Sequence, residues 1–396
     1  MSPRCYAALA AAALIAPAVA DAQSETRASI DVAPGVGYSS NPFSGTGSDL
    51  GAAYAGLDIT PSLSVSTARN TLAVTGSASL QQYFTRYSDN TSYRVSADYA
   101  GRPSERVTTH LRMDISSSII GGYDSFANGV IQPGGPTVPS PTDLGLFGSR
   151  DRRRGAYATG DISVALSQHD SVNASAFYEA ARYRRFADIA NYDGMGGTLG
   201  YNRQLSANTR IGLQGTVSRY DYPGARGQST VYTVNATGST KLSQFWTIDG
   251  AIGMSFVNST TIGSTNAASL SGSANLCRQG ELSTFCLNGS RSVRPTGLNG
   301  TQYVTLAGAS WSRRLSSVDS VSLRASYTME NGSRAIVLPG LRAQYLATSA
   351  SYERRLSERL RFTASAQYRD IFTSNLNRPA DFGGRIGISY RFGDLK

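Results

Sequence analysis

Residues 107–119 read VTTHLRMDISSSI, and the alternation within this stretch decides the fold. The apolar side chains share one parity: Val107, Leu111, Met113, Ile115 and Ile119. The polar side chains share the other: His110, Arg112, Asp114, Ser116 and Ser118. Successive side chains of an extended strand point to opposite faces, so the stretch predicts a β-strand with one apolar and one polar face.

The same alternation recurs along most of the chain, for example over 321–329 and 360–369. A soluble β-sandwich alternates as well, so composition has to separate the two classes. Charged residues make up 16% of the chain, against about 25% in ordinary soluble proteins, yet hydrophobic residues reach only 40%. After the N-terminal segment, no run of about 18 apolar residues predicts a transmembrane helix. This composition favours a wall with lipid on one side and water on the other.

Short and long connections alternate between the predicted strands. Five short links begin with a Leu-Ser dipeptide, and neighbouring copies lie about forty residues apart: Leu166-Ser167, Leu205-Ser206, Leu242-Ser243, Leu315-Ser316 and Leu356-Ser357. The segments between them are longer and irregular: 39–49, 85–91, 120–153, 184–191, 221–229, 257–300, 331–340 and 371–380. With earlier links at 66–70 and 101–106, seven short turns and eight long loops predict about 16 strands.

Aromatic residues mark both ends of these strands. Six lie near the short turns: Tyr99, Tyr201, Trp246, Trp311, Tyr352 and Phe362. Seven lie near the long loops: Tyr54, Tyr178, Tyr232, Phe256, Tyr303, Tyr345 and Tyr368. Two such belts are typical of the two faces of a bilayer. Because unpaired strand edges are costly in hydrocarbon, we predict an all-β fold, a transmembrane antiparallel up-and-down β-barrel with short periplasmic turns and long extracellular loops.

The two ends of the chain carry export signals. Residues 1–22 combine Arg4, an apolar run and small residues at a cleavage site, which predicts a secretory signal peptide ahead of a barrel domain over 23–396. Arg385, Gly387, Tyr390 and Phe392 lie in the last predicted strand. They look like the terminal signal that the barrel assembly machinery recognises, except that residues 393–396 follow the final aromatic.

Two further stretches resemble a known family. Residues 31–43, DVAPGVGYSSNPF, are similar to the opening strand and first loop of the β-barrel porin 2 family of bacterial outer-membrane proteins, and residues 57–63, LDITPSL, resemble its second strand. The resemblance implies an outer-membrane barrel that is associated, in some bacteria, with exopolysaccharide production.

Cys277 and Cys286 are the two cysteines that remain after the predicted signal peptide, which contains Cys5. They lie close together in a Ser/Gly/Asn-rich segment. In an oxidising compartment this spacing predicts a local disulfide. Two free thiols are an alternative, and a metal pair is disfavoured because neither a His nor a third Cys lies nearby.

The polar parity predicts the residues that line the lumen. All but two of the 37 basic residues are arginines, and the formal net charge is +10. The candidate lumen-lining residues are His110, Arg112, Asp114, Glu179, Arg324, Arg361, Arg369, Arg385 and Arg391. A ring of arginines favours anions in a pore, although these groups could equally pair with carboxylates across the lumen. The third long loop, 120–153, either folds inward to narrow the pore or lies on the surface.

These features predict a porin-like channel of the bacterial outer membrane for passive diffusion of small solutes, anionic ones among them. The alternative is an accessory barrel in exopolysaccharide export or surface assembly. No cluster of nucleophile and base, phosphate-binding loop or metal-ligand set appears around His110 or His169, so we predict neither enzymatic activity nor a cofactor. The expected partners are outer-membrane lipid, lipopolysaccharide, the assembly machinery and, for the alternative, polysaccharide-export components; nucleic acid is not expected.

Overall fold

The computed structural model describes residues 24–122, 144–185, 191–224, 227–260, 267–296, 300–331, 343–373 and 378–394. The predicted signal peptide, residues 1–22, lies outside these ranges. Within the described residues, no helix is long and apolar enough to cross a membrane.

Eighteen β-strands account for nearly all of the described chain, and the one short 3₁₀ helix is η2 (Leu144–Leu146). The strands are β1 (Glu25–Ser39), β2 (Ala52–Ser66), β3 (Asn70–Tyr83), β4 (Asn90–Ser104), β5 (Val107–Ile119), β6 (Arg152–Ala165), β7 (Asp170–Tyr183), β8 (Tyr192–Gln204), β9 (Thr209–Tyr222), β10 (Gly227–Lys241), β11 (Trp246–Ser259), β12 (Ala267–Gln279), β13 (Ser283–Thr296), β14 (Gly300–Arg314), β15 (Asp319–Asn331), β16 (Ala343–Arg355), β17 (Leu360–Thr373) and β18 (Asp381–Gly393).

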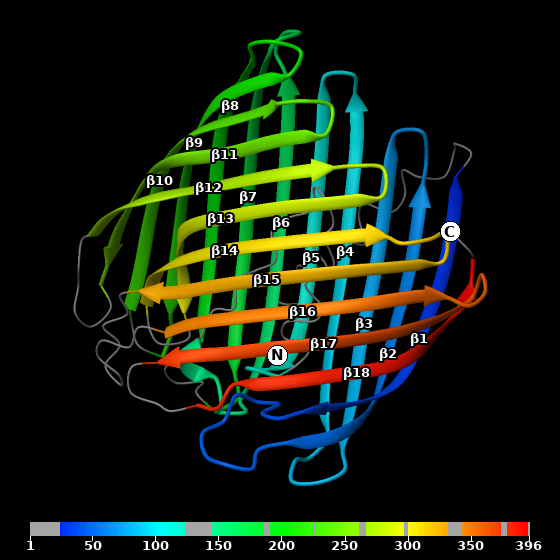
Figure 1. The fold of residues 1–396 in the computed structure, drawn as a ribbon. Helices are drawn as coiled ribbons and strands as arrows, with labels where there is room; N and C mark the ends of the chain where they lie inside the picture. The colour runs from blue at the N-terminus through cyan, green and yellow to red at the C-terminus, as the bar shows by residue number, and fades with distance from the viewer. Residues whose placement is uncertain are drawn as a thin grey trace.

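Each strand pairs antiparallel with its neighbours in sequence, and β1 pairs with β18, so the sheet closes into a barrel (Figure 1). At this seam Ile30 lies opposite Phe392 and Ser39 lies opposite Gly383. Closure gives both edge strands a partner, and such a barrel is a form in which a sheet can enter hydrocarbon without unpaired backbone groups.

The residues after Phe392 extend the closing seam. The Asp394 amide donates to the Ala28 carbonyl over 2.9 Å, and the Ala28 amide donates to Asp394 Oδ2 over 2.7 Å. Gly393 has a φ of 87°, and a Cβ there would lie 2.4 Å from the Ala28 carbonyl oxygen. A glycine is therefore required at this point, because other residues rarely adopt this conformation and would clash with β1.

The predicted number of strands, about 16, is wrong: the closed barrel has 18. The additional hairpin consists of β12 and β13, which occupy most of the segment 257–300 that was predicted to be one long loop. Gly280 begins the tight turn between them, where its amide donates to the Ser283 carbonyl over 2.8 Å. The eighteen strands are therefore joined by eight short turns and nine longer loops.

The five Leu-Ser dipeptides form five copies of one turn. In each, the serine Oγ accepts hydrogen bonds from the backbone amides two and three residues later, as Ser167 does from His169 (3.1 Å) and Asp170 (3.0 Å). The other four are Ser206, Ser243, Ser316 and Ser357. A serine hydroxyl that satisfies two amides stabilises a tight reversal, so the dipeptide explains why one end of the barrel has short links.

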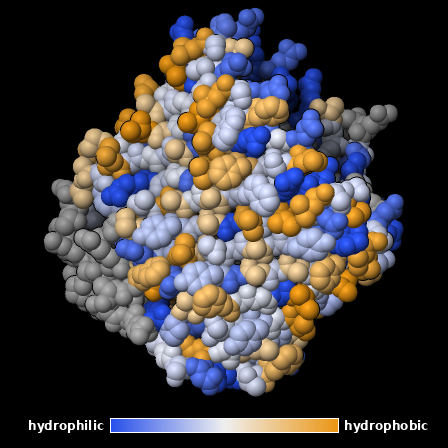
Figure 2. Space-filling model, viewed as in Figure 1, coloured by the Kyte–Doolittle hydropathy of each residue, from blue (hydrophilic) through white to orange (hydrophobic). Residues whose placement is uncertain are grey.

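The outer face of the barrel is apolar across the middle of the strands. Exposed side chains on it include Val95, Ile115, Leu213, Ile252, Leu270, Leu323 and Ile386. Figure 2 shows such residues spread over the face formed by the later strands, with hydrophilic residues gathered toward the edges where the short turns lie. The buried side chains lie inside the barrel, close to the long-loop ends of the strands.

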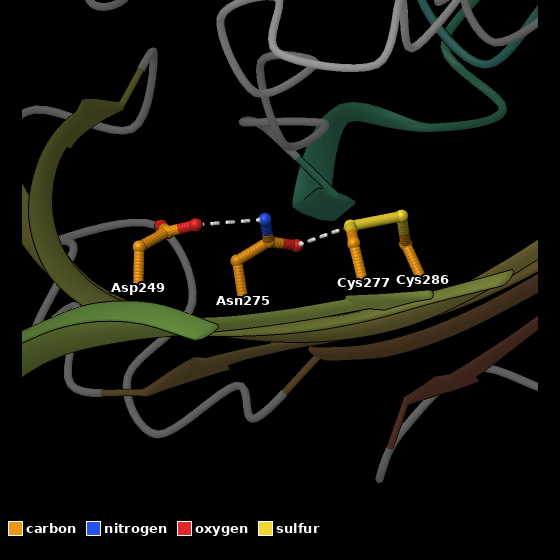
Figure 3. The surroundings of a disulfide bond; sticks show 4 residues. All are labelled: Asp249, Asn275, Cys277 and Cys286. Atoms are coloured by element: carbon orange, nitrogen blue, oxygen red, sulfur yellow. Dashed lines mark hydrogen bonds between the residues drawn. A yellow bond between two sulfur atoms is a disulfide. The ribbon is translucent and has the colours of Figure 1, made fainter. Parts of the chain in front are cut away.

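Cys277 and Cys286 form a disulfide between β12 and β13, where they are directly opposed in the strand register. The bond joins two strands and does not lie in a loop as the sequence indicated. Figure 3 shows both side chains on the same side of the sheet as Asn275 and Asp249. Asn275 Nδ2 donates to Asp249 Oδ1 over 3.1 Å, and Asn275 Oδ1 lies 3.6 Å from Cys277 Sγ. The disulfide is therefore part of a polar row on the inner face.

Replacing both cysteines with serine is expected to lower the free energy of unfolding by about 2–3 kcal/mol, because the bond closes a short loop in the unfolded chain. The midpoint of urea unfolding in detergent measures this, with and without reductant for the wild type. Titration of two free thiols in the oxidised, folded protein would contradict the pairing.

Candidate functional site in the barrel interior

Two arginines of β18 make ion pairs on the inner face next to the closing seam. Arg391 Nε and Nη2 donate to the two carboxylate oxygens of Asp31 on β1 over 2.7 and 2.6 Å. Arg385 Nη1 donates to Asp58 of β2, and its Nη2 donates to the Ala33 carbonyl over 3.1 Å. Both arginines were predicted to line the lumen, and the structure places them there as partners of carboxylates.

A second polar cluster lies on the inner face of β4, β5 and β6. Asp114 accepts a hydrogen bond from Arg94 Nε over 2.6 Å. His110 lies between two carboxylates, with Nε2 3.0 Å from Asp98 Oδ1 and Nδ1 3.6 Å from Asp161 Oδ2. Of these residues, the sequence predicts inward positions for His110 and Asp114 only. Their partners, Arg94, Asp98 and Asp161, have the same inward parity but were not among the predicted lumen residues.

The other predicted lumen residues are more exposed to the interior. Arg361 Nη1 donates to Glu353 Oε1 over 3.2 Å, and both side chains are about half-exposed. Arg112 Nε lies 4.0 Å from Asp98 Oδ2. Arg324 shares the inward parity of Thr328 on β15 and is half-buried. These residues form a charged, accessible lining below the long-loop end.

Glu179 on β7 is half-buried near the long-loop end, where positive charges lie around it. The charges of Arg153 on β6 and Arg294 on β13 act on its carboxylate. Arg153 Nη2 also donates to the Tyr192 hydroxyl over 3.2 Å. Two positive charges therefore act on one carboxylate, and neither arginine was among the predicted lumen residues.

Arg369 has a different environment from the other predicted lumen arginines, since only 2% of its side chain is exposed. Its Nε and Nη2 donate to Asp381 Oδ2 over 2.9 and 2.6 Å. Its Nη1 and Nη2 also donate to the carbonyls of Gly121 (3.1 Å) and Pro42 (3.3 Å). Arg369 thus joins β17 and β18 to the first and third long loops.

Asp381 completes this contact. Its Oδ1 accepts hydrogen bonds from Ser39 Oγ over 2.5 Å and from the Asn41 amide over 2.9 Å. These donors come from β17, from the last residue of β1 and from the first loop, so one buried ion pair holds the inward course of that loop. We call Arg369 and Asp381, with these partners, the loop clamp.

The third loop contributes an apolar segment to the interior. Leu144, Leu146 and Phe147 are buried, and the Phe147 ring contacts that of Tyr345 on β16 with centroids 5.8 Å apart. The sequence left open whether the loop 120–153 folds inward or lies on the surface, and residues 144–151 fold inward. Residues 123–143, which include the prolines, lie outside the described residues.

Tyrosines from β7, β8 and β9 surround this segment within the same buried cluster: Tyr183, Tyr192, Tyr220 and Tyr222. Tyr192 and Tyr222 contact each other with ring centroids 5.9 Å apart. The Tyr222 hydroxyl donates to the Gly300 carbonyl, which brings the first residue of β14 into the same cluster. We call this cluster, together with residues 144–147, the aromatic constriction.

The tip of the β13–β14 hairpin turns inward at this point. The described pairing of β12 with β13 ends at Gly272 and Arg291, whereas β13 continues beside β14 to Thr296, which is buried. Figure 1 shows this end of β13 curving away from β12. The Arg291 guanidinium spans the resulting gap, donating to Thr305 Oγ1 over 3.1 Å and to Ser269 Oγ over 3.3 Å.

A second buried cluster belongs to the first loop. Phe43 packs against Tyr83 of β3 and against Tyr87. The Arg150 guanidinium lies 5.2 Å from the Phe43 ring centroid and 5.3 Å from that of Tyr87. The first and third loops therefore meet through a cation–π contact inside the mouth of the barrel.

Two tyrosines assigned to the long-loop aromatic belt are interior residues instead. Tyr54 and Tyr345 are 2% and 1% exposed, and both have inward parity. Tyr54 can lie flat against the wall because its partner on β1 is Gly37, where a Cβ would come within 2.6 Å of the ring. Burial within the mouth explains why these rings do not face lipid.

The closed sheet, its apolar outer face and its charged inner face define this protein as a transmembrane β-barrel of the bacterial outer membrane. Inward loops and the aromatic constriction narrow its long-loop end.

No protein-family model matches the chain, and no curated protein matches it in sequence. Among solved structures it is similar to OprD of Pseudomonas aeruginosa, with 11% identity over 95% of this chain and 98% of that one and a TM-score of 0.44. It is also similar to Pseudomonas aeruginosa OccK2 in complex with glucuronate, with 10% identity, coverage of 94% and 99%, and a TM-score of 0.47. A BenF-like porin from Pseudomonas fluorescens has 9% identity, coverage of 93% and 99%, and a TM-score of 0.48.

Proposed function

We propose that this barrel is a non-enzymatic channel through which small solutes diffuse across the outer membrane, with a preference for anions. The observation that carries the proposal is the excess of positive charge at the narrowed end of a charged lumen. There the charges of Arg153 and Arg294 both act on the carboxylate of Glu179, while the Arg369–Asp381 pair adds no net charge. Confined positive charge raises the local concentration of anions and repels cations.

Arg378 adds to this excess. It is buried just outside β18, and within the described residues its Nε and Nη1 have no hydrogen-bond partner. Burial lowers the pKa of Arg378 from its ordinary value, because the charged form loses hydration. A small anion at the mouth would supply the missing hydrogen bonds.

The wild-type barrel is expected to form ion-conducting channels in planar bilayers, with a reversal potential in a salt gradient that indicates anion preference. Arg294→Glu should shift the reversal potential toward cation preference, since it changes the charge beside Glu179 by two units. Arg210→Glu is the matched control, because Arg210 lies on the inner face near a short turn, away from the constriction. Cation preference of the wild type, or equal shifts in both variants, would contradict the proposal.

The finer family assignment is also a proposal. Residues 31–43 and 57–63, which resemble the β-barrel porin 2 family, lie in β1, the start of the first loop and β2. The alternative role in exopolysaccharide export rests on that resemblance alone, and no contact within the described residues favours it. Recognition of Tyr390 and Phe392 by the assembly machinery likewise stays a prediction. Both rings have outward parity, and their centroids lie 4.6 Å apart.

A further inference from the structure

Arginines gather on the outer face of the barrel at the long-loop ends of β6 and β7. Arg154 of β6 lies directly opposite Arg182 of β7, and both have outward parity. One step further along, the Arg184 amide donates to the Arg152 carbonyl, which places this second pair beside the first. Like charges opposite each other on neighbouring strands are destabilising unless an anion compensates them.

Neighbouring strands neutralise only part of this charge. Arg182 Nη2 lies 2.6 and 2.8 Å from the two oxygens of Asp193 on β8, and Arg219 of β9 lies 3.2 Å from Asp221. Within the described part of the chain, Arg154 and Arg184 have no acidic partner. Five arginines on this surface, of which Arg152 is half-buried, are therefore balanced by only two carboxylates: Arg152, Arg154, Arg182, Arg184 and Arg219. We call this surface the outer arginine patch.

The patch lies immediately above the apolar band of the same strands. On β6 the outward residues below Arg154 run from Ala156 to Val164 and include the exposed Ile162. On β9, Val217 and Leu213 follow Arg219 in the same way. An apolar band of a transmembrane barrel is about 25 Å tall, so charges at its upper border lie at the level of lipid headgroups. At the long-loop end this is the outer leaflet.

We propose that the outer arginine patch binds the phosphates of lipopolysaccharide, the phosphorylated glycolipid of the outer leaflet. Guanidinium groups bind phosphate oxygens in a forked geometry, and two adjacent arginine pairs present several such forks to one headgroup. The proposal rests on the outer-membrane location but not on ion selectivity, because the patch lies outside the lumen.

The test compares two double variants of the full-length protein purified in detergent. Arg154→Gln/Arg184→Gln removes two charges from the patch and leaves both ion pairs intact. The matched control, Arg278→Gln/Arg313→Gln, removes two exposed arginines of outward parity near the short turns of β12 and β14. Bound lipopolysaccharide is measured by native mass spectrometry and by the rise in melting temperature when purified lipopolysaccharide is added.

The patch variant is expected to bind lipopolysaccharide at least about tenfold more weakly than the wild type, which corresponds to about 1.4 kcal/mol, while the control binds like the wild type. Equal binding by wild type and patch variant, or an equal loss in the control, would overturn the proposal. Equal stabilisation by phosphatidylglycerol micelles would overturn the assignment to lipopolysaccharide. Single-channel conductance is measured in the same preparations and is expected to stay unchanged in the patch variant. A failure of lipopolysaccharide binding can therefore be distinguished from a failure of the proposed channel function.

Discussion

Replacing Asp381 with asparagine is expected to destabilise the barrel by about 3–5 kcal/mol, because it leaves the Arg369 charge buried without its partner. Only 2% of each side chain in this pair is exposed. The loss should appear as a lower melting temperature in detergent. It should also appear as larger fluctuations of single-channel current, since Arg369 holds the Pro42 and Gly121 carbonyls of the first and third loops.

A double variant separates the charge from the contacts. Arg369→Met/Asp381→Leu removes both charges, so we expect it to be more stable than either single variant while its current still fluctuates. Glu353→Gln is the control, because its pair with Arg361 is half-exposed and such pairs contribute about 0–1 kcal/mol. A loss as small in Asp381→Asn as in Glu353→Gln would show that the loop clamp does not hold the mouth.

The error in the number of strands has a physical origin in the weak pattern of β12. Its outward residues include Gly272 and Ala274, which barely differ in hydrophobicity from the inward serines, so alternation is hard to recognise there. The spacing of turns carried the missing information. Leu242 and Leu315 lie 73 residues apart, nearly twice the usual interval, and Leu282-Ser283 falls between them. A 44-residue loop inside a regular barrel was itself evidence for another hairpin.

The faces of the strands could be predicted better than the partners across them. Parity alone indicates that Arg385 and Arg391 point inward. The environment of Arg369, however, depends on carbonyls 248 and 327 residues away in sequence, which no local period encodes. Tyr54 illustrates the same limit, since an inward tyrosine near a loop has the sequence signature of an interfacial ring. Its pairing with Gly37 was the available signal, because a glycine opposite an aromatic leaves room for the ring to lie against the wall.

Phe147→Ala is expected to raise the single-channel conductance severalfold. The Phe147 ring anchors the inward segment of the third loop against Tyr345, and removing a buried phenylalanine costs about 3–5 kcal/mol. The substitution weakens a contact in the interior and leaves the barrel wall intact, because Phe147 belongs to the loop between β5 and β6 and to no strand. We therefore expect the aromatic constriction to open while the strands stay paired.

The measurement is single-channel conductance in planar bilayers, together with the largest uncharged polymer that still reduces the current. Phe372→Ala is the matched control, because Phe372 is an exposed phenylalanine of outward parity at the same end of β17. Its loss should leave both quantities unchanged. If Phe147→Ala lowers the melting temperature without widening the pore, the third loop stabilises the mouth but does not limit passage, and the narrowest point lies elsewhere among the interior charges.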